Sequence, residues 1–143
     1  MKVGFDSSVL VAAMVDQLPN HDPAMEAFLR WSDSPHRGCC TTHALAECYA
    51  TLTALPLPRR IHPLEARLMI EENLVARLEI LETGQDEMLG SIRRASELGL
   101  ASGIIYDALH LAAAEHAGCE RFFTYNLRHF RRLEPKGLVL GAP

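Results

Sequence analysis

The sequence contains no apolar run of the roughly 20 residues that a membrane-spanning helix needs. Its first residues also lack the charged, apolar and small segments of a signal peptide. The cysteines form no C-x-x-C pair, and no histidine stands at zinc-finger spacing from them. These absences argue against a structural zinc site and predict a cytoplasmic protein with free, buried thiols. The cysteines in question are Cys39, Cys40, Cys48 and Cys119.

An excess of basic residues is also absent. Lysine and arginine together number 14, against 18 aspartates and glutamates, which gives a formal net charge of −4. This balance argues against a generally basic surface for nucleic acid but leaves room for a local basic patch. With 143 residues, 48% of them hydrophobic, the chain fits one domain over residues 1–143 that is long enough to bury a core.

What the sequence does contain is an alternation of short apolar runs and helical patterns. The runs predict strands at residues 2–6, 39–41, 78–81, 121–124 and 138–140. Helical spacing and end signals predict helices at 7–14, 22–31, 42–55, 63–77, 84–98 and 104–117, and a turn or short helix at 126–132. Strands separated by helices pair in parallel, because their connections are long and right-handed. The sequence therefore predicts an α/β fold, a three-layer α/β/α sandwich around a parallel sheet of about five strands.

Polar signals mark where two of the predicted helices begin. Ser7 or Ser8 is expected to cap the first helix, and Thr83 with Asp86 resembles a capping box for the helix at 84–98. The helix at 42–55 carries an apolar stripe expected to face the core, formed by Leu45, Cys48, Tyr49 and Leu52.

Three isolated carboxylates stand out in apolar surroundings. Asp6 is the only charged residue in VGFDSSVLVAAMV, Glu47 is the only one between residues 38 and 58, and Asp107 is the only one between 103 and 114. An unpaired buried carboxylate costs several kcal/mol or takes up a proton, and clustered carboxylates raise one another's pKa. A divalent cation removes this conflict, and oxygen ligands from Asp, Glu and Asn suit Mg²⁺ or Mn²⁺.

The predicted topology gives these residues a common location. In parallel sheets, ligands bind outside the carboxyl ends of the strands, near the point where the strand order reverses. Asp6 ends the first predicted strand, and Asn126 lies just beyond the strand at 121–124. Both are therefore expected at the binding edge of the sheet.

Simpler roles remain open for each acid. Asp6 would cap the first helix, and Glu47 would form an ion pair with an arginine such as Arg59 or Arg30. Asp107 would be an acid near a helix N-terminus with no further role. The histidines near these positions are expected to be solvated or to lie in the core rather than to act in catalysis; they are His43, His110 and His129.

Four stretches together resemble PIN-domain ribonucleases, and within them the VapC toxins of bacterial and archaeal toxin–antitoxin pairs. They are VGFDSSVLVAAMV, THALAECYATLT, IIYDALHLAAAEHAG and FFTYNLRHF, and they occur in the family's order over nearly the whole chain. The resemblance implies that the family's three acidic metal ligands correspond to Asp6, Glu47 and Asp107. Asn126 takes the place of a fourth position that is aspartate in many PIN domains. Ser8 and Thr124 match small polar positions and are expected to contact metal-bound water.

The resemblance further implies a Mg²⁺- or Mn²⁺-dependent endoribonuclease, the toxin of a type II toxin–antitoxin system. The ion would activate a water that attacks the phosphodiester and leaves 5′-phosphate and 3′-hydroxyl ends. The implied partners are an RNA substrate, a VapB-like antitoxin and a second copy of the chain, with the helices at 22–31 and 64–77 as partner surfaces. Candidate RNA contacts are Arg128, Arg131 and Arg132 after Asn126, and Arg59 and Arg60 after the helix of Glu47. The alternative is a catalytically silent PIN-like regulatory module that acts through protein contacts.

Overall fold

The computed structural model describes residues 1–143, and none of its helices is long and apolar enough to cross a membrane. The elements follow in the order β1 (Lys2–Phe5), α1 (Ser7–Met14), α2 (His21–Ser32), β2 (Arg37–Thr41), α3 (Thr42–Ala54), α4 (Pro63–Met69), the π-helical turn η1 (Ile70–Val75), β3 (Glu79–Leu81), α5 (Gln85–Glu97), α6 (Ile104–His116), β4 (Arg121–Phe123), α7 (Leu127–Arg132) and β5 (Val139–Gly141).

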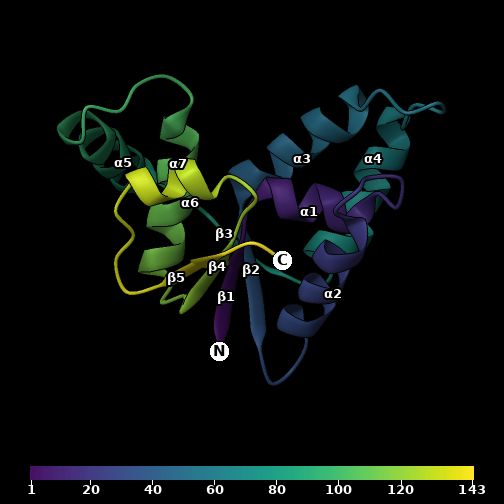
Figure 1. Ribbon diagram of the computed structural model, residues 1–143, viewed down its shortest axis with the longest axis horizontal. Helices are drawn as coiled ribbons and strands as arrows, with labels where there is room; N and C mark the ends of the chain where they lie inside the picture. Colours follow the sequence, from purple (N-terminus) through teal and green to yellow (C-terminus); the bar gives the residue numbers. More distant parts are fainter.

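The five strands form one parallel sheet in the order β3-β2-β1-β4-β5, as the sequence predicts (Figure 1). After β1, the next two strands, β2 and β3, are added on one side of it. The last two strands, β4 and β5, are added on the opposite side of β1. The strand order therefore reverses between β1 and β4. The carboxyl ends of these two strands adjoin one another, because Phe5 pairs with Phe123 across them.

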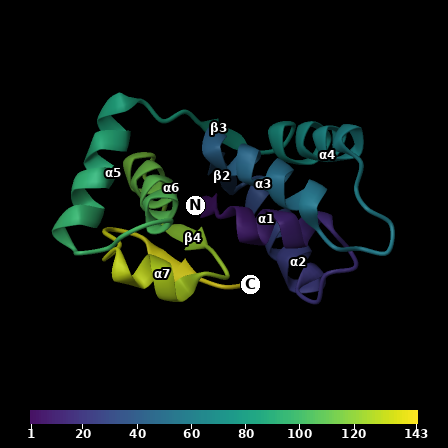
Figure 2. The same cartoon turned by 90° about the horizontal axis from the view of Figure 1, so that it is seen from above.

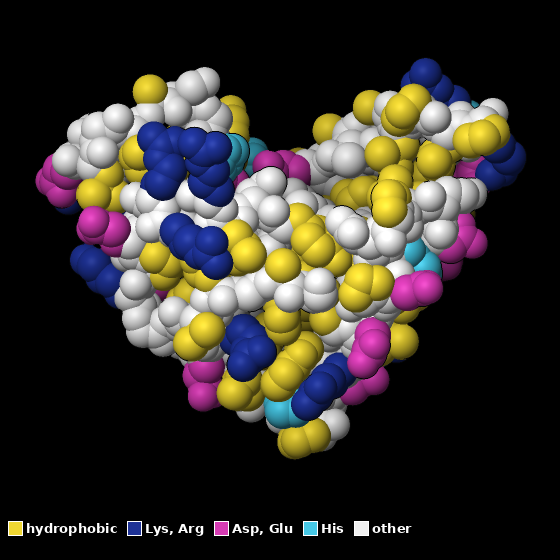
Figure 3. Space-filling view, in the orientation of Figure 1, with side chains coloured by type: hydrophobic (Ala, Val, Ile, Leu, Met, Phe, Trp, Pro, Cys, Tyr) yellow, Lys and Arg dark blue, Asp and Glu magenta, His cyan; other side chains and the backbone are white.

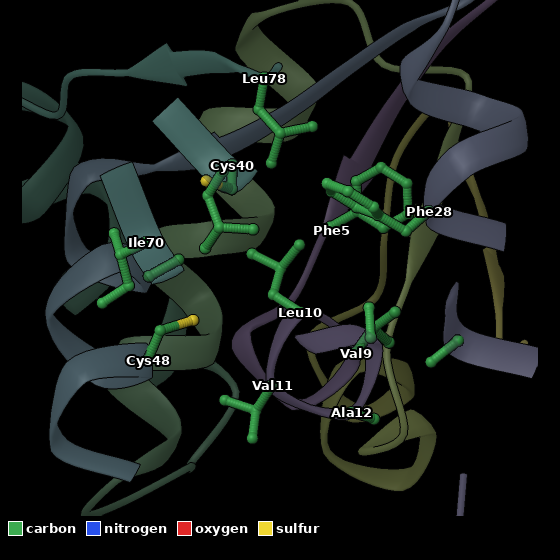
Figure 4. Packing of buried hydrophobic residues seen from close by; sticks show 14 of the residues in the cluster. Phe5, Val9, Leu10, Val11, Ala12, Phe28, Cys40, Cys48, Ile70 and Leu78 are labelled. Atoms are coloured by element: carbon green, nitrogen blue, oxygen red, sulfur yellow. The ribbon is translucent and has the colours of Figure 1, made fainter. Parts of the chain in front are cut away.

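Helices cover both faces of the sheet, which confirms the predicted three-layer sandwich. Figure 2 shows α1 to α4 on one side of the strands and α5 to α7 on the other. Successive strand residues point to opposite faces, so Phe5 and Cys40 enter the larger core under α1 to α4 (Figure 4). Cys39 and Phe122 enter the smaller core under α6 and α7.

The central strand has no side chain at Gly4, and the packing requires this. A Cβ atom there would lie 2.6 Å from Cδ2 of Phe122 and 3.4 Å from Cβ of Ala114. Phe122 is fully buried and packs on Phe130, with the ring centroids 4.9 Å apart, so it has little room to move. The missing side chain lets α6 approach the centre of the sheet, and α6 carries one of the three predicted acids.

Three details of the helices bear on the sequence predictions. Asp6, and not Ser7 or Ser8, caps α1, which is the simpler role that the sequence left open for this acid; its Oδ1 accepts a hydrogen bond from the backbone N–H of Ser7 at 2.9 Å. No complete capping box forms at α5, because the helix begins at Gln85 and its cap is Gly84, which has no side chain; only the backbone N–H of Gly84 donates to Oε2 of Glu87. Tyr49 points away from the core, and the buried stripe of α3 consists of Ala44, Cys48 and Leu52.

Candidate metal centre at the carboxyl end of the sheet

The molecule is hollowed at the carboxyl end of the sheet. Figure 3 shows a notch there, between an arm that carries α3 and α4 and an arm that carries α5 to α7. Acidic side chains line the bottom of the notch, with histidines beside them. The notch is therefore where the predicted acids meet.

Asp6 is fixed at the floor of this notch. Its side chain is almost fully buried, with 2% of the residue exposed, and its backbone N–H donates to the carbonyl of Phe123 at 2.9 Å. Oδ2 accepts hydrogen bonds from the hydroxyls of Ser8, at 2.7 Å, and Thr124, at 2.8 Å. With the backbone donor on Oδ1, three donors orient the group, which is the pattern of an ionised carboxylate. One lone pair on Oδ1 stays available to a further partner.

The hydroxyls of Ser8 and Thr124 also accept hydrogen bonds from the backbone after β4. Ser8 Oγ accepts from the backbone N–H of Tyr125 at 3.1 Å, and Thr124 Oγ1 accepts from that of Asn126 at 2.9 Å. Each hydroxyl thus ties the segment after β4 to Asp6. Each hydroxyl uses its one proton for Asp6 and so holds the carboxylate and the chain around it; a contact with metal-bound water, as the sequence predicts, would use the remaining acceptor site.

Asn126 lies beside Asp6, as the sequence predicts. Its Nδ2 atom is 3.5 Å from Oδ2 of Asp6, and the residue is exposed at the mouth of the notch. Asn126 lies three residues after the end of β4 and directly before the first residue of α7. A neutral side chain here places no fourth negative charge next to the acids.

Glu47 reaches the site from α3 and is held by a histidine on α6. Nε2 of His110 forms a short hydrogen bond to Oε1 of Glu47. Nδ1 of His110 is 2.7 Å from the hydroxyl of Thr41, which also accepts the backbone N–H of Ala44 as the cap of α3. Because the ionised carboxylate of Glu47 can only accept, Nε2 must carry a proton, and the hydroxyl of Thr41, which keeps its own proton, can donate to Nδ1. His110 therefore donates to Glu47.

Burial is the largest single influence on the pKa of Glu47 and raises it, but the hydrogen bond and charge of His110, with smaller effects of His43 and Ser7, together hold the pKa below its usual value. The alternative role of Glu47, an ion pair with an arginine, is wrong, because its partner is His110. Arg59 pairs with Glu65 at 3.0 Å, and the guanidinium of Arg30 lies over the ring of Trp31. His110 is a core residue, as predicted, with 2% of its surface exposed, but it belongs to the site and not to packing alone.

Asp107 stands one turn before His110 on α6. Burial and the negative charge of Asp6 raise its pKa to about 6, against the opposing effect of His129. Nδ1 of His129, on α7, lies 3.3 Å from Oδ2 of Asp107. Asp107 lies outside the group of Asp6, Glu47 and His110, whose ligand atoms are within 4.8 Å of one another, although the charge of Asp6 still influences it.

The donor set fits a divalent cation. Oxygen or nitrogen atoms of Asp6, Glu47 and His110 lie within 4.8 Å of one another, and Asp107 faces the charge of Asp6. Carboxylate and amide oxygens are the ligands that Mg²⁺ and Mn²⁺ prefer. A cation between the acids would relieve the repulsion that raises the pKa of Asp107.

The predicted RNA contacts divide into two groups. Arg128 and Arg131 are exposed on α7, next to Asn126. Arg132 lines a pocket of about 370 Å³ that also includes Asp107, Asn126 and His129. Arg59 lies on the other arm, after α3, and is engaged by Glu65.

Sequence reasoning missed His110 as part of the site. The available signal was its spacing: three residues after Asp107 on one helix, it lies on the same helix face as that acid. Thr41 was predicted only as the end of a strand. Its hydroxyl role depends on the cap of α3 and on contact with α6, and both are features of the folded chain.

The fold and the site together place the chain in one class: α/β proteins with a parallel sheet and a cluster of carboxylates at the point where the strand order reverses. The chain matches the family model described as "PIN domain" over residues 4–135 and belongs to that family. It is 34% identical over 112 residues to Ribonuclease VapC27 of Mycobacterium tuberculosis (strain ATCC 25618 / H37Rv), a match that covers 78% of this chain and 76% of that protein.

Solved structures share the fold at low sequence identity. Mycobacterium tuberculosis VapC20, described as a sarcin–ricin loop cleaving toxin, aligns with a TM-score of 0.74 and 14% identity over 95% of this chain and 98% of that one. VapBC2 from Rickettsia felis, bound to a DNA fragment from its promoter, aligns with a TM-score of 0.70 and 17% identity over 100% and 99%. FitAB bound to a DNA fragment aligns with a TM-score of 0.69 and 14% identity over 99% and 94%.

Proposed function

We propose that this protein is a Mg²⁺- or Mn²⁺-dependent endoribonuclease and the toxin of a type II toxin–antitoxin pair. One observation carries the proposal: a buried, fully oriented Asp6 at the strand reversal, with Glu47 and His110 within 4.8 Å of it and Asp107 near enough to be influenced by its charge. A fixed cluster of like charges is costly unless a cation is part of its function. Membership of the PIN family and the identity to a ribonuclease give that function its reaction class.

Asp6, Glu47 and Asp107 would hold the ion through their carboxylates, and Asn126 would approach it from the end of β4. When bound, such an ion lowers the pKa of a water, orients it toward a phosphodiester and offsets the charge that develops on the phosphate. The chain itself supplies rigidity. Ser8 and Thr124 hold Asp6, and His110 holds Glu47, so the carboxylates need little reorganisation when the substrate arrives.

RNA would enter along α7. Basic side chains gather over this helix beside the notch (Figure 3), and Arg128 and Arg131 are exposed on it. Their charge attracts the phosphate backbone toward the acids, although the net charge of the chain is −4. Arg132 would bind a phosphate next to the scissile one, because its pocket adjoins Asp107. Arg59, on the opposite arm, would contact RNA only after releasing Glu65.

Two protein partners are proposed from the similarity to VapC proteins: an antitoxin and a second copy of this chain. The similarity to VapC27 and to the VapBC2 structure supports a VapB-like antitoxin that covers the notch, and a homodimer. Large hydrophobic side chains are exposed on α4 and η1, at Leu64, Leu68 and Val75, and provide a surface for one of these contacts. The four free cysteines fit a reducing compartment, which supports a cytoplasmic location.

Removal of divalent ions tests the proposal. Purified protein should cleave RNA in Mg²⁺ or Mn²⁺, lose all cleavage in EDTA, and regain it when either ion is added in excess, as measured by gel electrophoresis of labelled RNA. Circular dichroism in EDTA should show that the fold persists. Cleavage that continues in EDTA would contradict the metal site. A folded protein that binds neither ion and cuts no RNA would instead be a regulatory module.

A further inference from the structure

Two aromatic rings lie face to face at the notch, and neither the metal site nor the core accounts for them. His43, in the first turn of α3, and Tyr106, in the first turn of α6, have ring centroids 4.8 Å apart and an interplanar angle of 6°. The pair therefore joins the two arms. Neither ring belongs to either hydrophobic cluster, and 48% of Tyr106 is exposed.

The pair adjoins the acids on both arms. Tyr106 directly precedes Asp107 on α6, and His43 stands one turn before Glu47 on α3, on the same face of that helix. The ring of His43 also packs near the ring of His110, with the centroids 5.5 Å apart. His110, which binds Glu47, thus packs against the His43 side of the pair. Tyr106 forms the other side, and 48% of it is exposed.

An exposed planar ring beside a phosphodiester-cleaving site suits one ligand chemistry. Proteins that bind single-stranded nucleic acid stack unpaired bases on aromatic side chains, because every base has a planar face. Bases in a duplex are already stacked on one another and cannot reach such a ring. A tyrosine backed by a second parallel ring loses little conformational freedom when a base binds it.

We propose that Tyr106, backed by His43, is a stacking platform for an unpaired nucleobase next to the scissile phosphate. The inference rests on the proposed ribonuclease function and adds to it the residue that would hold an unpaired base beside the scissile phosphate. Tyr106 adjoins Asp107 in the sequence, and Arg132 lines a pocket with Asp107, so a base on the ring and a phosphate at Arg132 would both lie next to that acid.

The test measures binding of a short single-stranded RNA and of the same sequence as a duplex, in Mg²⁺, with the Asp6→Asn change present in every protein to prevent cleavage. Tyr106→Ala should weaken binding of the single strand about tenfold and leave duplex binding unchanged. Tyr106→Phe and Tyr106→Trp should bind like the parent, because stacking needs the ring and not the hydroxyl. Tyr49→Ala, which removes an exposed tyrosine on the far side of α3 from Glu47, is the matched control.

A 2-aminopurine in the single strand provides a second readout, since its fluorescence falls when it stacks. The quenching should be present in the parent, Tyr106→Phe and Tyr106→Trp proteins and lost in Tyr106→Ala. Equal affinity of Tyr106→Ala and the parent would overturn the platform, as would equal losses for single strand and duplex. It would also be overturned if Tyr106→Ala weakened binding of an antitoxin peptide but not of RNA. If the wild-type protein neither binds nor cuts any RNA, the proposed function itself fails.

Discussion

Replacing Asp6 with asparagine should lower the rate of RNA cleavage by roughly 10³-fold while the protein stays folded. Asp6 is one of three carboxylates proposed to hold the ion, and it is the most rigidly placed of them. A bound ion contributes several kcal/mol of charge stabilisation to such reactions, and each 1.36 kcal/mol corresponds to about a tenfold change in rate. The measurement is the initial cleavage rate of labelled RNA in saturating Mg²⁺.

The fold should survive because asparagine keeps most of the contacts. Its carbonyl oxygen can accept from the N–H of Ser7, and asparagine is as good a helix cap as aspartate. The hydroxyls of Ser8 and Thr124 can rotate to accept from the new amide group. Loss of like-charge repulsion should also bring the pKa of Asp107 down from about 6 toward its usual value.

The matched control is Asp16→Asn, an aspartate exposed to solvent just beyond α1. It should cleave RNA at the wild-type rate. Thermal unfolding of both variants separates loss of chemistry from loss of structure. A folded Asp6→Asn protein that keeps more than about a tenth of the wild-type rate would show that this carboxylate does not hold the ion.

Replacing His110 with alanine should reduce cleavage roughly 10- to 100-fold and also destabilise the protein. His110 contacts no substrate in this proposal, and it acts by positioning Glu47. Loss of a residue that orients a metal ligand typically costs 10- to 100-fold in affinity for the metal or in activity. The buried ring also satisfies Thr41, so its removal should lower the free energy of unfolding by about 1–3 kcal/mol.

Rescue by glutamine separates positioning from packing. The amide nitrogen of glutamine at this position can reach Glu47 much as Nε2 does. The His110→Gln variant should therefore keep more activity than His110→Ala and should need less Mg²⁺. His116→Ala, an exposed histidine on the same helix, should behave like the wild type. If His110→Ala and His110→Gln lose the same amount of activity and need the same Mg²⁺ concentration, then His110 only fills space and does not position Glu47.

Much of the fold was predictable because its signals are local. Each strand is a short apolar run, buried in β1, β2 and β4, and the alternation of strands with helices permits only long parallel connections. The order β2-β1-β4 then places Asp6 and Asn126 together, as the sequence suggests. The three acids were visible for a related reason, since a lone charge in an apolar element needs a partner.

The partners of those acids were not predictable to the same degree. Glu47 was expected to need a cation, and the nearest arginines in the sequence were natural alternatives, but α6 brings His110 to it across 63 positions. The two hydroxyls that hold Asp6 come from α1 and from the end of β4, and their second bonds depend on the path of the backbone after Thr124. Such contacts arise from tertiary geometry and leave no spacing signal in one sequence.

The most direct measurement is cleavage of RNA in H₂¹⁸O with Mg²⁺, followed by mass spectrometry of the new ends. Water that attacks the phosphodiester and expels the 3′ oxygen leaves a 3′-hydroxyl and a 5′-phosphate that carries one ¹⁸O atom, and this is the expected result. Fragments with a 2′,3′-cyclic phosphate and a 5′-hydroxyl would mean attack by the ribose 2′-hydroxyl. That outcome would contradict hydrolysis by a water at the site of Asp6, Glu47 and Asp107.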